Sequence, residues 1–483
     1  MPFNSQEALK LARLKLAQDA LKKMFLVHGA NFTFPFDLIW QNLPSGTNVP
    51  SVNRPSQMKP LIDEGWIEQT GAMTRAVSEA RAGSATPEYR FGPKLVPASK
   101  TPTPTSGPPP IGDQLKQMQL EMDKEGYVIS TAELTNFFLA MMVSPLVILS
   151  GISGVGKSLL PRQFAKHSAS GFHQIPVQPQ WTDNSDLFGY VPTLAPDKFI
   201  EGRLVQGLRE ALADKSKLVI ALLDEMNLAP VEHYFSDFLS VAETRIRVGT
   251  SINTDKLPLD LPPSLTGQPD AYRDLRGIGL PHNLRVVGTA NMDETTRSFS
   301  PKVLDRAFTI EFDDPDLTQF AAGSAGSGAR LTDLAAAIVR EANPITVLEA
   351  RDTGKDLFEQ VSVIIQDIFD ILSPSGIKFG YRTRDAILLY LFHWRRLALE
   401  NVLAGNAALD FCFLQKILPK ISGSGDALNV ALGALADWLR RDRKGTLEES
   451  PLGFNGPFTR SLQKVERMKA LLESDGATHY WGV

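Results

Sequence analysis

The sequence is poor in cysteine, with Cys412 as the single one among 483 residues. This scarcity excludes a disulfide framework and a cysteine-rich metal site, and it fits a reducing compartment. Cys412 stands among apolar neighbours in FCFLQKIL, a context that favours a small buried side chain over a reactive thiol. The seven histidines form no H-E-x-x-H pattern, so the zinc site of that class of metalloprotease is excluded as well.

Long apolar runs are also missing. The candidate LTNFFLAMMVSPLVILSG is broken by Ser144 and Pro145 and does not supply the roughly 20 apolar residues of a membrane-spanning helix. The chain begins with a charged helical pattern instead of the apolar core of a secretory signal. We therefore expect a cytoplasmic protein with no membrane contact.

Neither sign of charge dominates, since the formal net charge is −4 with 22% charged and 43% hydrophobic residues. Binding to nucleic acid or to a membrane surface would therefore require a local patch. At roughly 100 to 200 residues per domain, the length predicts about two to four domains. The Pro-, Ser- and Thr-rich stretch 96–113 (VPASKTPTPTSGPPPIGD) is predicted to be a linker between two of them.

Residues 1–95 are predicted to form a small winged-helix-like α+β domain. A long helix, a short helix in FPFDLIWQNL and a third helix ending before Gly65 precede two strand-like runs, WIEQT and EYRFGPKL. Three helices followed by a hairpin is the order of a winged helix-turn-helix, which binds DNA. Pro60 interrupts the third helix, and nearby acidic residues offset the basic ones, so a protein-docking role stays open. The basic residues are Arg54, Lys59, Arg75, Arg81 and Arg90.

Residues 114–315 alternate β-rich apolar runs with helical segments, which predicts an α/β domain with a parallel sheet. The predicted strands are PLVILSG, HQIPVQP, KLVIALLDE, LRVVGTANMD and AFTIEF. From 316 to 483 the pattern becomes helical, as in TRDAILLYLFHWRRLALENVLAG. We expect this last part to form a helical lid.

A phosphate-binding loop is predicted between the first strand and the helix that follows it. The segment GISGVGKS fits the pattern G-x-x-x-x-G-K-[ST] in the required strand-loop-helix context. Backbone N–H groups of such a loop surround phosphates, Lys157 is expected to reach the β- and γ-phosphates, and Ser158 is expected to bind Mg²⁺. The candidate nucleotide-binding residues are Gly151, Ser153, Gly154, Val155, Gly156, Lys157, Ser158 and Leu159. An ordinary glycine-rich turn is the alternative.

Two carboxylates end the third predicted strand. Asp224 is expected to hold Mg²⁺ with Ser158, and Glu225 to polarise the attacking water. Asn291 ends the next strand and is expected to orient that water. Arg306, one helix later, is predicted to reach the phosphate of a neighbouring copy, which implies a ring. A salt bridge of Arg306 with Asp305 or Glu311 is the alternative.

Together these motifs resemble those of the AAA+ superfamily, and more narrowly its McrB-like branch from restriction and phage-defence systems. The narrower resemblance is carried over about 130–425 by VQPQWTDNSDLFGYVPT, LLDEMNLAPVEHYFSDFLSVAE, GTANMDETTRSFSPKVLDRAF, GIKFGYRTRDAILLYL and QKILPKISG. It implies that Asn291 is a sensor residue, that Arg306 acts in trans, and that Arg297 lies near the subunit interface. It also implies that Arg382 or Arg384 of the lid senses the γ-phosphate.

The resemblance further implies a hexameric Mg²⁺-dependent ATPase or GTPase that works with a separately encoded McrC-like nuclease subunit. DNA would be contacted through 1–95. ATP and GTP both stay open, because ANMDET replaces an M-N-T-A-D type signature and related MoxR-like rings carry a similar motif. A MoxR-like ATPase chaperone that remodels a protein partner is the alternative.

Overall fold

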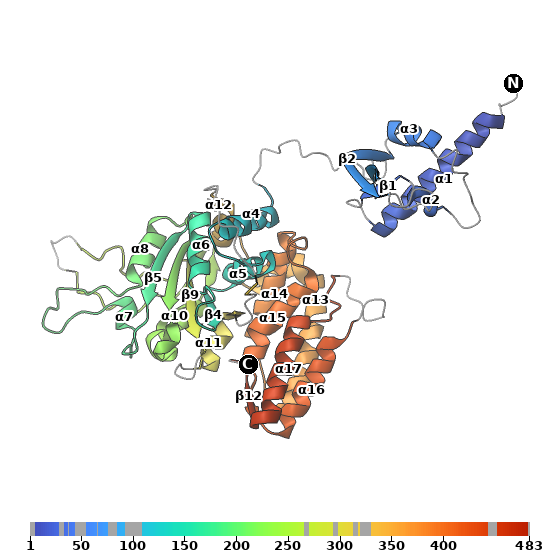
Figure 1. The fold of residues 1–483 in the computed structure, drawn as a ribbon. Helices are drawn as coiled ribbons and strands as arrows, with labels where there is room; N and C mark the ends of the chain where they lie inside the picture. The colour runs from blue at the N-terminus through green and yellow to red at the C-terminus, as the bar shows by residue number, and fades with distance from the viewer. Residues whose placement is uncertain are drawn as a thin grey trace. The chain divides into compact units, whose positions relative to one another are not determined.

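The computed structural model describes residues 5–28, 33–36, 38–43, 55–64, 66–75, 85–91, 109–264, 270–292, 298–312, 317–318, 330–442 and 452–481. These belong to two compact units, Met1–Gly107 and Pro108–Val483, which are described separately (Figure 1). In the ranges given, no helix combines the length and the apolar character that crossing a membrane requires.

The first unit packs three helices against a small antiparallel sheet. Its elements are α1 (Ser5–His28), β1 (Thr33–Pro35), α2 (Leu38–Gln41), α3 (Pro55–Asp63), β2 (Ile67–Arg75) and β3 (Ala85–Phe91). The strand order is β1-β3-β2, so the sequence-predicted hairpin β2–β3 gains a short third strand. Pro60 lies inside α3. Arg90 forms an ion pair with Glu68 at 2.8 Å, which reduces the positive charge of this hairpin.

The basic residues of this unit are only partly described. Lys59 on α3 is exposed. The side chains of Arg54, Arg75 and Arg81 lie outside the described residues. The DNA-binding role predicted for 1–95 therefore stays a prediction.

The second unit is built around a five-stranded parallel sheet, which confirms the α/β class predicted from the sequence. Its strands are β4 (Leu146–Gly151), β5 (Gly171–Pro176), β6 (Val219–Asp224), β9 (Leu284–Asn291) and β10 (Phe308–Phe312), and all five were expected. The order across the sheet is β10-β4-β9-β6-β5. Every residue of β4 is buried, so both faces of this internal strand are covered.

Helices and one small hairpin precede, connect or follow these strands. They are α4 (Ile111–Lys124), α5 (Thr131–Val143), α6 (Leu159–Ser168), α7 (Ser185–Phe188), α8 (Val205–Ala213), α9 (Val231–Tyr234), α10 (Ser236–Glu243), β7 (Ile246–Val248), β8 (Ser251–Asn253), α11 (Pro301–Arg306) and α12 (Thr332–Val339). A capping box between Ser130 and Glu133 starts α5, which ends before the break at Ser144 and Pro145. The helix α4 begins at Ile111, inside the predicted linker 96–113.

A helical part follows the sheet and forms a bundle beside it (Figure 1). It comprises α13 (Val347–Leu372), α14 (Tyr381–Arg396), α15 (Gly405–Cys412), a π-helical turn η5 (Phe413–Ile417), the short 3₁₀ turn η6 (Leu418–Lys420), α16 (Asp426–Arg440), α17 (Thr459–Asp475) and the ladder β11–β12 (Ser422–Ser424 and Ala477–His479). Cys412 is buried within it, as expected, and burial raises the pKa of its thiol.

The first helix described after β10 is α12, and the boundary predicted at residue 316 lies outside the described residues. The apolar face of α12, which includes Leu334 and Ile338, is buried. Leu331 N–H donates to the carbonyl of His167 at the end of α6, at 2.7 Å. The contacts of α12 are with α4, α5 and α6 of the sheet layer, so the bundle proper starts at α13.

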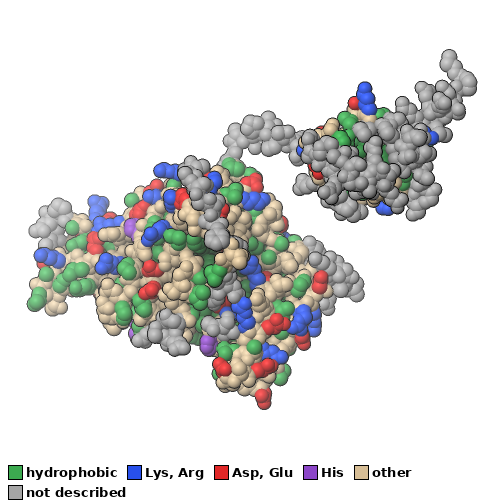
Figure 2. Space-filling view, viewed as in Figure 1, with side chains coloured by type: hydrophobic (Ala, Val, Ile, Leu, Met, Phe, Trp, Pro, Cys, Tyr) green, Lys and Arg blue, Asp and Glu red, His purple; other side chains and the backbone are tan. Residues whose placement is uncertain are grey.

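Figure 2 shows the described residues from the same side as Figure 1, and acidic and basic side chains are intermixed on the face in view.

Candidate functional site

The loop between β4 and α6 has the backbone form predicted for a phosphate-binding loop. Gly151, Gly154 and Gly156 have φ values of +139°, +87° and +85°, a region that side chains with a Cβ rarely adopt. Ser153 and Gly154 are exposed, Val155 and Gly156 are partly buried, and Leu159 begins α6. The loop therefore presents its backbone at the start of a helix, where N–H groups attract anions.

Gly156 is fixed by a close neighbour as well as by its backbone conformation. A Cβ at this position would lie 2.7 Å from Cε2 of Tyr127, which precedes α5. The Tyr127 ring is buried, so it has little room to move away. Gly154 has the same type of backbone conformation but nothing within 4 Å of the equivalent point. Of these two residues, only Gly156 has to be glycine for lack of space as well as for its positive φ.

The ammonium group of Lys157 lies inside the loop. It donates to the carbonyl oxygens of Gly151 at 2.9 Å and of Ile152 at 2.6 Å. Only 6% of Lys157 is exposed. A buried cation held at the mouth of the loop is placed to attract the charge of an incoming phosphate group.

Ser158 and Asp224 meet at the carboxyl edge of the sheet. The Ser158 hydroxyl donates to Asp224 Oδ1 at 2.6 Å, and the Gln174 amide donates to Oδ2 at 2.8 Å. Burial raises the pKa of Asp224, but the hydrogen bonds from Ser158, Thr289 and Gln174 and the charge of Arg162 outweigh it and hold the pKa below its usual range. Asp224 is therefore a carboxylate at neutral pH.

Thr289 connects Asp224 with its neighbour Glu225. Its hydroxyl donates to Asp224 Oδ1 at 2.8 Å and accepts the N–H of Glu225 at 2.9 Å. Glu225 has a left-handed backbone conformation, with φ +56° and ψ 49°. Such strain in a non-glycine residue persists where surrounding contacts enforce it, and it is common at functional sites. Asn291 Nδ2 donates to Glu225 Oε1 at 3.3 Å. The two residues expected to act on the attacking water therefore lie side by side.

These oxygen ligands suit a hard cation. Ser158 and Asp224 offer a hydroxyl and a carboxylate, which are ligand types that Mg²⁺ accepts beside nucleotide phosphates. Among the described residues no cluster of three or more His, Cys, Asp or Glu forms a metal site of another kind. Ser158 and Asp224 would hold the ion, while Glu225 and Asn291 lie next to it and can act on a water molecule.

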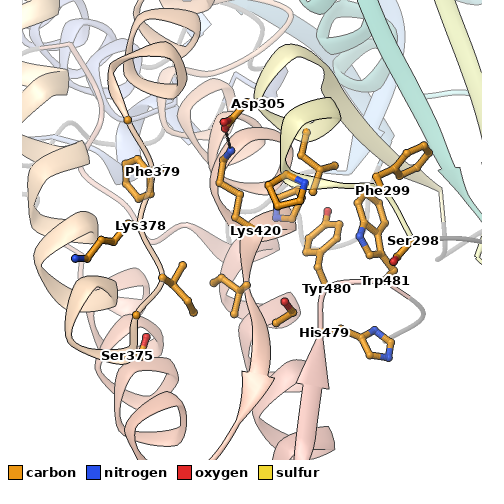
Figure 3. Close-up of a pocket in the computed structure, with 18 of the residues that line it drawn as sticks. Ser298, Phe299, Asp305, Ser375, Lys378, Phe379, Lys420, His479, Tyr480 and Trp481 are labelled. Carbon is orange, nitrogen blue, oxygen red and sulfur yellow. Dashed lines mark hydrogen bonds and ion pairs between the residues drawn. The ribbon is translucent and has the colours of Figure 1, made fainter. Parts of the chain in front are cut away.

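A cavity of about 860 Å³ lies between α11 and the helical part, apart from the loop and the carboxylates. Figure 3 shows aromatic side chains on its wall together with an ion pair between Asp305 and Lys420. Its lining residues include Phe299, Phe379 and Trp481, and none of the phosphate-loop residues.

Arg306 lies at the opposite edge of the sheet from the phosphate loop. It ends α11 just before β10, and its carbonyl accepts the hydroxyl of Ser144 at 3.0 Å, next to the amino end of β4. β4 has six residues, so its ends are roughly 17 Å apart at about 3.3 Å per residue. Arg306 is thus far from the loop of its own chain.

The partner of Arg306 differs from both predicted ones. Arg306 forms an ion pair with Glu243, with Nε 2.6 Å from Oε1. Asp305 instead pairs with Lys420, and Glu311 pairs with Lys464 at 2.7 Å. These carboxylates are engaged by lysines of the helical part, a tertiary arrangement that sequence proximity did not reveal.

The lid arginines are not at the phosphate loop either. Arg382 lies beside Arg306, with Nη2 2.7 Å from Glu243 Oε1. Arg384 pairs with Asp385 at 2.7 Å and lies over the ring of Tyr381. The helix α14 thus brings Arg382 to the amino edge of the sheet, away from the loop of its own chain, and the γ-phosphate role expected for Arg382 or Arg384 stays a prediction. Arg297 lies outside the described residues.

Sequence reasoning missed three contributors to the site. Thr289 had a signal, because it stands two residues before Asn291 in a strand and so shares its face of the sheet. Gln174 lies near the end of the neighbouring strand β5. Tyr127 had no local signal, since its contact with Gly156 depends on how α5 packs.

Comparisons with known proteins cover parts of the chain. A family model described as a domain of unknown function, DUF8727, matches residues 339–477, the helical part and under a third of the sequence. No curated protein matches. Among solved structures, a candidate ATPase from Cytophaga hutchinsonii is similar at 17% sequence identity and a TM-score of 0.39, covering 64% of this chain and 87% of that one.

Proposed function

We propose that the protein is a Mg²⁺-dependent nucleoside triphosphatase that takes ATP or GTP. One observation carries the proposal: the Ser158 hydroxyl, at the end of a loop of the phosphate-binding type, meets the ionised Asp224 at 2.6 Å. A serine and a carboxylate in this relation are the usual Mg²⁺ partners in P-loop enzymes. Lys157 then neutralises charge on the β- and γ-phosphates.

Glu225 acts on the attacking water in this scheme. Its carboxylate follows the metal-binding Asp224 and is contacted by the amide of Asn291 at 3.3 Å. A carboxylate can accept the proton of the water, and the amide can orient both. Thr289 holds the backbone of Glu225 in its strained conformation and so fixes where the carboxylate points.

We further propose that copies of the chain form a ring in which Arg306 serves the nucleotide of the next copy. The distance of Arg306 from its own loop supports this, because an arginine that stabilises the transition state must touch the phosphates. The sequence resemblance to McrB-like motors favours a hexamer that acts on DNA, through 1–95, together with a nuclease subunit.

Nucleotide binding and hydrolysis test the central proposal. Calorimetry with Mg²⁺ and a non-hydrolysable ATP or GTP analogue should detect binding to the wild type and none to Lys157→Ala. Glu225→Gln should bind the analogue with affinity within about twofold of the wild type and lose roughly 100-fold or more of the turnover. Glu232→Gln, which changes an exposed carboxylate on α9, is the matched control. A wild-type protein that binds neither the ATP nor the GTP analogue would refute the proposal.

Nucleotide turnover measured with and without duplex DNA tests whether the partner is DNA or a protein. A McrB-like role predicts stimulation by DNA that weakens with added salt and is lost when 1–95 is removed. Unchanged turnover with methylated and unmethylated duplexes would instead favour a chaperone that acts on protein.

A further inference from the structure

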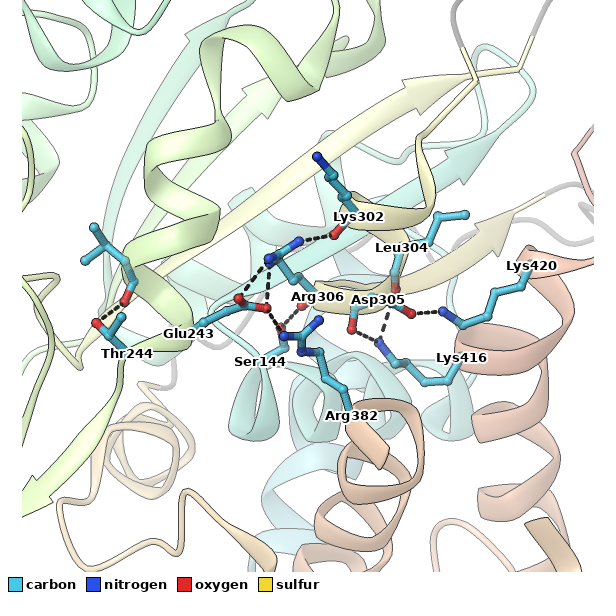
Figure 4. Close-up of polar contacts among 11 residues, drawn as sticks. Ser144, Glu243, Thr244, Lys302, Leu304, Asp305, Arg306, Arg382, Lys416 and Lys420 are labelled. Atoms are coloured by element: carbon cyan, nitrogen blue, oxygen red, sulfur yellow. Dashed lines mark hydrogen bonds and ion pairs between the residues drawn. The ribbon is translucent and has the colours of Figure 1, made fainter. Parts of the chain in front are cut away.

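One carboxylate holds two arginines from different parts of the second unit. Glu243 at the end of α10 is 2.6 Å from Nε of Arg306 on α11 and 2.7 Å from Nη2 of Arg382 on α14. Its second oxygen accepts a hydrogen bond from Arg306 Nη2 at 2.8 Å. Figure 4 shows both guanidinium groups converging on this single carboxylate. The sequence motifs do not single out Glu243.

The guanidinium of Arg306 donates hydrogen bonds within its own chain from Nη1 and Nη2, and its Nε lies against Glu243 as part of the ion pair. Nε and Nη2 contact Glu243, and Nη1 donates to the carbonyl of Lys302 at 2.8 Å. The side chain of Arg306 is only 20% exposed and that of Glu243 only 28%, while Arg382 is 53% exposed. Arg306 therefore has to release Glu243 before it can present its paired donors to another anion.

The surroundings of this cluster are rich in positive charge. Lys416 donates to the carbonyls of Leu304, Asp305 and Ala307 at 3.3, 3.0 and 2.6 Å, and so fastens the end of α11 to the helical part. Arg306 and Arg382 pair with Glu243, and Lys420 pairs with Asp305, so three cationic side chains engage two carboxylates (Figure 4). The cluster as a whole attracts anions.

We propose that Glu243 is a placeholder for phosphate: it holds Arg306 and Arg382 side by side, and a polyphosphate tail displaces it. A carboxylate and a phosphate present the same pair of oxygens to the guanidinium fork, and the polyphosphate brings more charge. The assignment of the tail to a nucleotide bound by a second copy rests on the proposed function. Displacement breaks the link that Glu243 makes between α10 and α14.

Binding of inorganic tripolyphosphate tests, without a nucleotide, whether phosphate displaces Glu243 from the two arginines. The measurement uses full-length Lys157→Ala protein, in which the phosphate loop no longer competes, and isothermal calorimetry at low salt. Adding Glu243→Gln, which keeps the shape and removes the charge, should tighten tripolyphosphate binding about five- to tenfold, since a competing partly exposed ion pair is removed. Adding Arg306→Ala should abolish it. A variant that merely damaged the fold would not gain affinity.

A matched control separates the contact from net charge. Asp385→Asn removes the same charge from α14, where Asp385 pairs with Arg384 and not with Arg306 or Arg382. It should change tripolyphosphate affinity by less than twofold. The side chain in Glu243→Asp is too short to contact both arginines, so this variant should bind tripolyphosphate with an affinity between those of the parent and Glu243→Gln. It replaces Glu243→Gln in the test if the Gln variant does not fold. Equal affinity in the Gln, Asp and parent proteins would overturn the proposal.

A second measurement identifies the source of the phosphate. Self-association of otherwise wild-type protein is followed by mass photometry with Mg²⁺ and a non-hydrolysable triphosphate. Glu243→Gln should assemble at a several-fold lower concentration than the parent. Tighter tripolyphosphate binding with unchanged assembly would keep the anion site and reject the second copy as its source, and it would leave the nucleotide site at the phosphate loop unaffected.

Discussion

The hydroxyl of Ser158 donates to Oδ1 of Asp224 at 2.6 Å, joining the end of the phosphate loop to the end of β6. The two residues are 66 positions apart, and the parallel sheet brings them together because β4, β9 and β6 end at one edge. Asp224 accepts further bonds from Thr289 and Gln174, so its carboxylate is oriented from three sides.

This contact predicts that Asp224→Asn uncouples Mg²⁺ from nucleotide binding. The amide keeps the size of the side chain but loses the charge, and loss of a metal-orienting carboxylate costs roughly 10- to 100-fold in metal affinity. The Mg²⁺-dependent gain in affinity for a triphosphate should fall by that factor, whereas affinity in excess chelator should not fall. Asp214→Asn, at the exposed end of α8, is the control. An unaltered Mg²⁺ dependence in Asp224→Asn would contradict the assignment.

The two loop glycines offer a matched pair for stability. Gly154→Ala and Gly156→Ala share the cost of a positive φ, about 1 kcal/mol. Only Gly156→Ala adds a contact of 2.7 Å with the buried Tyr127 ring, and overpacking of this kind costs about 1 to 3 kcal/mol more. Urea denaturation of the nucleotide-free proteins should show this difference. Equal unfolding free energies of the two variants would mean that the Tyr127 ring moves aside at little energetic cost.

Much of the fold was predictable because its signals are local. Each of the five strands is a short apolar run bounded by turn residues, and Ser144–Pro145 marks the boundary between α5 and β4. The strand order and the packing of α12 on the sheet layer depend on tertiary contacts, which leave no local pattern. For that reason the sequence does not show that α12 packs on the sheet layer while α13 belongs to the bundle.

The same division holds within the site. The predicted site residues end or follow strands, so the sequence indicates that they gather at the carboxyl edge of the sheet. They are Lys157, Ser158, Asp224, Glu225 and Asn291. The pairing of Arg306 and Arg382 through Glu243 joins residues up to 139 positions apart and depends on the placement of α14. Such a contact cannot be predicted from spacing.

Mixing two inactive variants tests whether Arg306 acts on a neighbouring copy. Arg306→Ala keeps its phosphate loop and lacks the arginine, while Lys157→Ala has the opposite defect. In an equal mixture, about a quarter of adjacent pairs combine an intact loop with an intact arginine, so that share of wild-type turnover should return. A mixture of Lys157→Ala with Glu225→Gln should remain inactive, because both defects disable the same pocket. A rate equal to the sum of the separate variants would exclude action in trans.

The helical part contains a histidine that resists protonation. His393 on α14 is fully buried, and its Nδ1 faces Nη2 of Arg396 at 3.1 Å. Burial, with the charge of Arg396 in addition, lowers the pKa of His393 from 6.5 to about 3. A proton on the ring would face a guanidinium, so the neutral form is the one that fits.

This depressed pKa predicts a specific loss of stability in mild acid. Between the folded pKa of about 3 and the unfolded value of 6.5, only the unfolded chain binds the proton, so stability falls as the pH falls through this window. The free energy of unfolding should drop by about 1.5 kcal/mol between pH 6.5 and about pH 5 because of this residue alone. His393→Gln keeps an acceptor for Arg396 and cannot titrate, so its unfolding free energy should decline less over that range by the same amount. Urea denaturation of both proteins at each pH measures the difference. Parallel declines would show that His393 is protonated in the folded protein, contrary to its burial beside Arg396.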